Sequence, residues 1–88
     1  MRQIVRSATE RLLKQGSIIR VVAVPPGVSR GSPRDTRRLF RAMVGRQFKV
    51  RAIEREPLLL LRLDVSKVGV PLLGSTAHEV WIEPEYVA

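Results

Sequence analysis

Two alternating segments in the second half of the chain restrict the possible fold most. Residues 47–52 alternate between polar and apolar side chains, which is the period-two pattern of a half-buried strand. A turn at residues 54–57 leads into residues 58–65, where every second side chain from Leu59 to Val65 is apolar. Two such strands joined by a short turn predict an antiparallel pair, and therefore a mainly β domain.

A first strand and one helix are predicted before this pair. Residues 17–24 are rich in β-branched side chains and end at two prolines and a glycine, so they predict a strand followed by a surface loop over 25–33. Ser32 suits the N-cap of a helix over residues 33–44, and Gly45 suits its end.

The C-terminal part is predicted to contain a long loop, a last strand and a turn. Residues 68–76 contain two glycines and a proline and predict the loop, and residues 78–82 predict the strand. Residues 83–86 predict a single 3₁₀ turn with Pro84 in its first position. For the last strand two orientations stay open, with the inward residues being either His78, Val80 and Ile82 or Glu79 and Trp81.

The domain is expected to comprise residues 16–88, preceded by a separate segment over residues 1–15. This segment contains a possible capping box at residues 7–10, which would begin a short helix ending near Gly16. A basic arm without regular structure is an equally good interpretation, because so short a helix is marginal alone.

Charge and composition restrict the partner and the compartment. Residues 1–51 carry 13 Lys and Arg against 2 Asp and Glu, whereas residues 52–88 carry 3 against 6. A positive field of this kind attracts phosphate polymers, acidic proteins or anionic lipids without selecting among them. The chain has no cysteine, no apolar run of membrane-spanning length and no signal-peptide pattern, so we expect a cytoplasmic protein that does not associate with a membrane.

The order of these elements resembles SH3-like small barrels. The similarity rests on "GSIIRVVAVPP", "VGRQFKVRAIE", "LLLLRLDV" and "HEVWIEPEYV", which together cover roughly residues 16–88. The pattern looks like KOW-type barrels of ribosomal and transcription-elongation proteins and like the barrel of nitrile hydratase β subunits, and it is typical of a small bacterial protein. The resemblance implies a barrel of about five strands, with a short helix inserted after the first strand and a closing 3₁₀ turn.

The sharpest candidate site is a row of four arginines on the predicted helix. A guanidinium can bind phosphate oxygens bidentately and keeps its charge, so such a row suits the backbone of RNA or DNA. A solvated helix face is the alternative interpretation. The helix would bury Thr36, Leu39, Phe40 and Met43 and expose Arg34, Arg37, Arg38 and Arg41. Three further cations could extend the basic surface along the next strand, namely Arg46, Lys49 and Arg51.

A protein-interaction or accessory-subunit module is the alternative function. Its contact surface would be apolar and aromatic, as in SH3 domains that bind peptides, although the aromatic residues could equally belong to the core. This surface would comprise Leu58, Leu60, Trp81 and Tyr86. Enzymatic activity is not expected, because His78 is the single histidine and no nucleophile motif, phosphate loop or metal-ligand cluster accompanies it. No cofactor is expected, and the sequence does not predict an oligomeric state.

Overall fold

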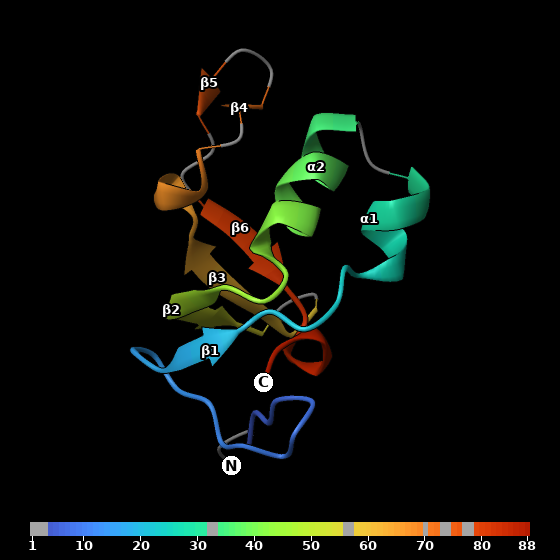
Figure 1. Cartoon of the computed structure of the whole chain (residues 1–88). Helices are drawn as coiled ribbons and strands as arrows, with labels where there is room; N and C mark the ends of the chain where they lie inside the picture. The colour runs from blue at the N-terminus through green and yellow to red at the C-terminus, as the bar shows by residue number, and fades with distance from the viewer. Residues whose placement is uncertain (1–3, 32–33, 56–57, 70, 73–74, 77–78) are drawn as a thin grey trace.

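A four-stranded antiparallel sheet organises the fold (Figure 1). The structure is a computed structural model that describes residues 4–31, 34–55, 58–69, 71–72, 75–76 and 79–88. The strand order is β1-β2-β3-β6, so the predicted pairing of the two alternating segments is confirmed, as is the mainly β class. The strands are β1 (Ile18–Arg20), β2 (Gln47–Glu54), β3 (Leu60–Asp64) and β6 (Glu79–Ile82).

Alternation along the strands separates an inner from an outer face of the sheet. Seven inward residues are buried and join one hydrophobic core, and Ile53, opposite the inward Leu61, is half-buried against it. The seven are Ile19, Phe48, Val50, Leu61, Leu63, Val80 and Ile82. Of the two orientations left open for the last strand, the one with Val80 and Ile82 inward is therefore correct. The outer face carries polar and charged residues with three large apolar ones; its residues include Ile18, Lys49, Arg51, Leu60, Arg62, Asp64, Glu79 and Trp81.

Strands β2 and β3 change register at Arg51. Val50 lies opposite Leu63, and the next paired residue, Ala52, lies opposite Arg62. Arg51 is therefore the extra residue of a β-bulge, which bends the strand locally and changes the direction of the side chain.

Helix α2 (Arg34–Met43) packs on the inner face of the sheet, as predicted. Leu39, Phe40 and Met43 are at most 5% exposed and belong to the same core as the inward strand residues. The helix is terminated two residues after Met43 by Gly45, whose φ of 83° is the left-handed conformation that glycine adopts at little cost. The amide of Gly45 donates a hydrogen bond of 2.7 Å to the carbonyl of Val21, which ties the end of the helix to the first strand. The predicted N-cap, at residue 32, lies outside the described residues.

The predicted surface loop over residues 25–33 is wrong in part, because a second helix, α1 (Pro26–Gly31), forms there. Proline in the first position has a φ already suited to a helix. Val28 packs against the core and thereby holds the helix in place. The predicted loop over residues 68–76 likewise contains regular structure, since β4 (Pro71–Leu72) and β5 (Ser75–Thr76) pair as a short hairpin after η1 (Ser66–Val68).

The C-terminal residues pair with the end of the first strand. The predicted 3₁₀ turn is confirmed as η2 (Pro84–Tyr86). Beyond it, Ala88 and Arg20 exchange two backbone hydrogen bonds of 2.8 and 3.1 Å, and the amide of Val22 donates to the carbonyl of Tyr86 at 2.9 Å. Figure 1 shows this C-terminal turn beside β1.

The sheet is open, and it does not close into the predicted five-stranded barrel. Strands β1 and β6 are its two edges. The first strand, predicted over residues 17–24, ends at Arg20. The amides of Val21 and Val22 donate to the carbonyls of Arg46 and Tyr86, and the two prolines at positions 25 and 26 have no amide hydrogen to donate. On the side of β1 away from β2, Arg20 pairs with Ala88 beyond η2 and not with β6.

The segment over residues 4–17 forms a closed turn that docks on the domain, and its described residues contain no helix. The hydroxyl of Ser7, which is 5% exposed, accepts hydrogen bonds from the amides of Thr9 and Arg11, each at 3.2 Å. Val5 and Leu13 lie in the core and are joined by a backbone hydrogen bond of 2.9 Å. Glu10 adopts a left-handed backbone conformation with a φ of 65°, which a right-handed helix cannot contain, and this explains why the capping box does not begin one.

Candidate nucleic-acid interface

The arginine row lies on the side of α2 that faces away from the core. Arg34, Arg38 and Arg41 are exposed and Arg37 is half-buried, while the opposite side of the helix is buried. Among the described Lys and Arg residues, only Arg6 and Arg62 form ion pairs with described carboxylates. The four guanidiniums therefore keep their charge uncompensated by any described carboxylate.

Arg37 provides a more specific feature of this surface. Its Nε atom is buried and has no hydrogen-bond partner among the described residues. An unsatisfied buried donor is costly, and because this atom is out of contact with solvent, a ligand oxygen can accept from it only after the side chain moves. The one acid of α2, Asp35, lies in the first turn, where its negative charge interacts favourably with the positive end of the helix dipole.

The cations of β2 do not extend this surface as predicted. Phe48 and Val50 point toward the core that α2 completes, so Lys49 and Arg51 point to the other side of the sheet. The structure therefore divides the predicted basic surface into two. Arg46, in the turn between α2 and β2, lines a hollow together with Lys49 and Arg51 and belongs to the outer surface.

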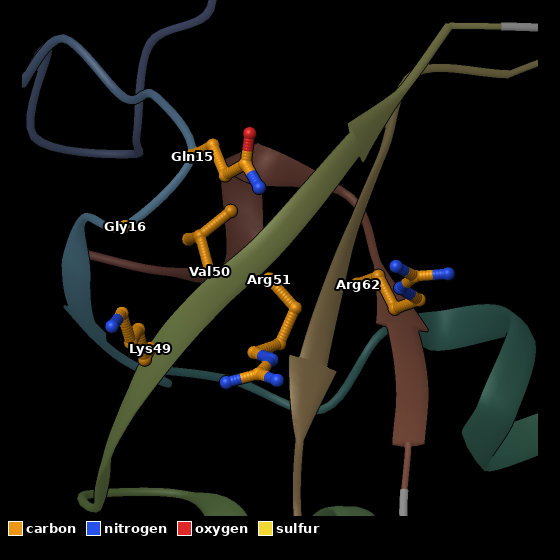
Figure 2. A pocket seen from close by; sticks show the side chains of 6 residues that line it. All are labelled: Gln15, Gly16, Lys49, Val50, Arg51 and Arg62. Atoms are coloured by element: carbon orange, nitrogen blue, oxygen red, sulfur yellow. The ribbon is translucent and has the colours of Figure 1, made fainter.

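The hollow shown in Figure 2 lies on the outer face of the sheet, where Arg51 is central. Its charged lining residues are all cations, Lys49 and Arg51 from β2 and Arg62 from β3, and Gln15 and Gly16 close one side. Arg51 also lines two adjoining hollows, one of which includes Lys67. Sequence reasoning missed Arg62 and Lys67, because local patterns do not specify which residues of β3 and η1 lie beside Arg51.

Carboxylates occupy the β3 and β6 side of the same face. Arg62 forms an ion pair with Glu79 at 3.0 Å and a longer one with Glu54 at 3.9 Å. Asp64 lies opposite Glu79 and accepts hydrogen bonds from the amide and the hydroxyl of Ser66, at 3.0 and 2.7 Å. The outer face is therefore positive along β2 and close to neutral or acidic along β3 and β6.

The residues of the alternative apolar surface are separated by the fold. Leu58 is 60% exposed and Trp81 is 46% exposed, and Leu60 shares the outer face with Trp81. Tyr86 instead packs against the core from η2. Desolvation raises the pKa of the Tyr86 hydroxyl above its ordinary value of 10.0, and the charges of Glu85 and Glu83 raise it further.

Residues that could carry metal or catalytic chemistry do not converge in the described part of the chain. No group of three Asp, Glu or His side chains there could hold a metal ion. His78 lies outside the described residues. Within those residues, no helix combines the length and apolar character needed to cross a membrane.

Comparison with protein-family models, with curated proteins and with solved structures finds no match for this chain. The similarity to SH3-like, KOW-type and nitrile hydratase β barrels therefore stays a prediction.

Proposed function

We propose that this protein is a non-enzymatic module that binds the phosphate backbone of RNA or DNA through the arginine face of α2. The observation that carries the proposal is the row of four arginines without a described carboxylate partner, presented on a helix whose other side is fixed in the core. A helix that is already packed in the core presents these guanidiniums without the cost of ordering the backbone, which a disordered arm has to meet when it binds.

The spacing of the four arginines supports contact with successive phosphates. Positions 34, 37, 38 and 41 lie at i, i+3, i+4 and i+7, so they form one stripe along about 10 Å of helix. A phosphate oxygen is a strong acceptor for the guanidinium groups of Arg34, Arg38 and Arg41, which are exposed.

We also propose that the domain is an open variant of an SH3-like barrel and that it acts in the cytoplasm. The pairing of residues 20–22 with residues 86–88, after a 3₁₀ turn, supports this relationship to the barrel. The absence of cysteine is consistent with a reducing compartment.

The test compares two double variants of equal net charge. Arg38→Ala with Arg41→Ala removes two cations from α2, and Lys14→Ala with Arg55→Ala removes two exposed cations elsewhere. Binding of a fluorescently labelled RNA or DNA is measured by anisotropy at low salt. The α2 variant is expected to bind at least about tenfold more weakly than the control variant, since each lost phosphate contact weakens binding.

Equal binding by the two variants, or no binding of the wild-type protein to any nucleic acid, would contradict the proposal. A protein partner that co-purifies after nuclease treatment and tolerates the α2 substitutions would instead support the interaction module with Leu58, Leu60, Trp81 and Tyr86.

A further inference from the structure

The outer face of the sheet carries a second basic site, on the side opposite to α2. Lys49 and Arg51 lie two residues apart on β2, about 6 to 7 Å along the strand, and both are exposed. Neither forms an ion pair with a described residue. They line one hollow whose charged groups are all positive (Figure 2). An anionic group therefore matches this position by charge.

The β-bulge gives this site a fixed geometry. Because Arg51 is the extra residue of the bulge, its side chain is directed by the irregularity of the backbone and lies between the hollows on either side. A cation held by rigid strands is better placed for a ligand than one on a loop.

Arg62 separates the anionic site from a tryptophan. It is held by Glu79 at 3.0 Å and by Glu54 at 3.9 Å, so its charge is largely compensated. Trp81 lies directly opposite Arg62 on β6 and is 46% exposed, and its indole makes no hydrogen bond or ring contact with a described residue. The indole therefore has an accessible surface on the outer face.

The distribution of charge across the face orients a ligand. Two strand spacings separate β2 from β6, which is about 10 Å. A phosphate is favoured along β2 and disfavoured near Asp64 and Glu79, whereas an uncharged base tolerates the acidic side. A nucleotide with its phosphate on β2 and its base directed toward Trp81 satisfies both conditions.

We infer that the outer face of the sheet binds single-stranded nucleic acid, with a phosphate between Lys49 and Arg51 and a base stacked on Trp81. Base stacking on an aromatic side chain is tolerant of sequence and requires an unpaired base. This site is distinct from the proposed α2 surface, and it implies a preference for single strands that backbone contacts alone do not give.

Trp81 is the single tryptophan of the chain, so its intrinsic fluorescence reports this site alone. The protein is titrated at low salt with single-stranded oligonucleotides of about four residues, (U)₄ and (dT)₄, and with a longer duplex as comparison. Both single strands are expected to quench Trp81, and the duplex is not.

Substitutions separate the two surfaces. Lys49→Glu with Arg51→Glu is expected to weaken quenching at least about tenfold, whereas Arg38→Glu with Arg41→Glu, which has the same net charge, is expected to leave it unchanged. In anisotropy measurements, Trp81→Ala is expected to weaken binding of the same labelled tetranucleotide about tenfold, and Trp81→Phe to restore most of it.

Three results would overturn the inference: no quenching by either single strand, equal quenching by the duplex, or quenching that persists in the β2 variant. Quenching by an acidic peptide such as poly-glutamate, with none by the oligonucleotides, would overturn it in favour of an acidic protein partner. Failure of the α2 proposal alone would leave the quenching intact, so the two outcomes are distinguishable.

Discussion

Replacement of Leu39 by alanine tests whether α2 is docked as the structure shows. Leu39 is fully buried and packs in the core between the helix and the sheet. Removal of a buried leucine side chain costs about 2 to 5 kcal/mol, with the larger values where the surroundings cannot collapse into the cavity. A domain of 88 residues has a total stability of only about 4 to 13 kcal/mol. Leu39→Ala should therefore remove a large share of it.

Urea unfolding, followed by far-UV circular dichroism and by Trp81 fluorescence, measures this loss. The matched control is Arg41→Ala, two residues further along the same helix but exposed, which should change the free energy of unfolding by no more than about 0.5 kcal/mol. A loss of 3 kcal/mol corresponds to a fall in Tm of roughly 12 to 24 °C for a domain of this size.

Equal stabilities of the Leu39→Ala and Arg41→Ala variants would refute the reasoning. Such a result would mean that α2 does not pack on the sheet through this side. The arginines would then have no defined direction, and the proposed interface would lose its geometric basis.

Three other substitutions or titrations test separate features. Ser7→Ala should destabilise the protein by about 0.5 to 1.5 kcal/mol in urea unfolding, because the amides of Thr9 and Arg11 lose their acceptor in a part-buried turn. A neutral effect would contradict the docked N-terminal turn. Gly45→Ala should lower the free energy of unfolding by about 1 to 2 kcal/mol, and the left-handed backbone alone is the cause, since nothing lies within 4 Å of the added carbon. The control Gly27→Ala lies at a helical position with equal space, so its effect on the free energy of unfolding should be neutral or stabilising. Because the pKa of Tyr86 is raised in the folded state, its contribution to stability is fully present below pH 10 and is lost as the pH rises through the folded-state pKa. Absorbance titration of this single tyrosine should therefore show a midpoint above 10.0 that falls toward it in Glu85→Gln; a midpoint at or below 10.0 would contradict the described surroundings.

Local patterns were sufficient to predict most of the sheet and the helix. Alternation identifies β2 and its buried face as far as Val50, whereas Ala52, expected on the same face, lies opposite the outward Arg62 because of the bulge. The 3.6-residue periodicity identifies which side of α2 is buried. Gly45 marks the end of that helix because a left-handed residue is needed there. Each of these features depends on residues close together in the chain, so the sequence contains the information directly.

The features that sequence reasoning missed depend on distant contacts. Helix α1 is held by the packing of Val28, and the N-terminal turn by a buried hydroxyl, neither of which has a periodic pattern. Lys49 and Arg51 follow the α2 arginines closely in the chain, so the sequence predicted one continuous basic surface. In the structure, β2 and α2 direct these cations to opposite sides of the sheet. The grouping of Lys49, Arg51 and Arg62 at the outer site depends on the pairing of β2 with β3, which local patterns do not specify.

The salt dependence of nucleic-acid binding tests the central claim most directly. The logarithm of the binding constant is measured against the logarithm of salt concentration for the wild-type protein and for the variant in which Arg34, Arg37, Arg38 and Arg41 are all alanine. If the four guanidiniums each neutralise one phosphate, the slope of the variant should be shallower by about 3, at roughly 0.7 to 0.9 per contact. Equal slopes would show that α2 does not contact the backbone.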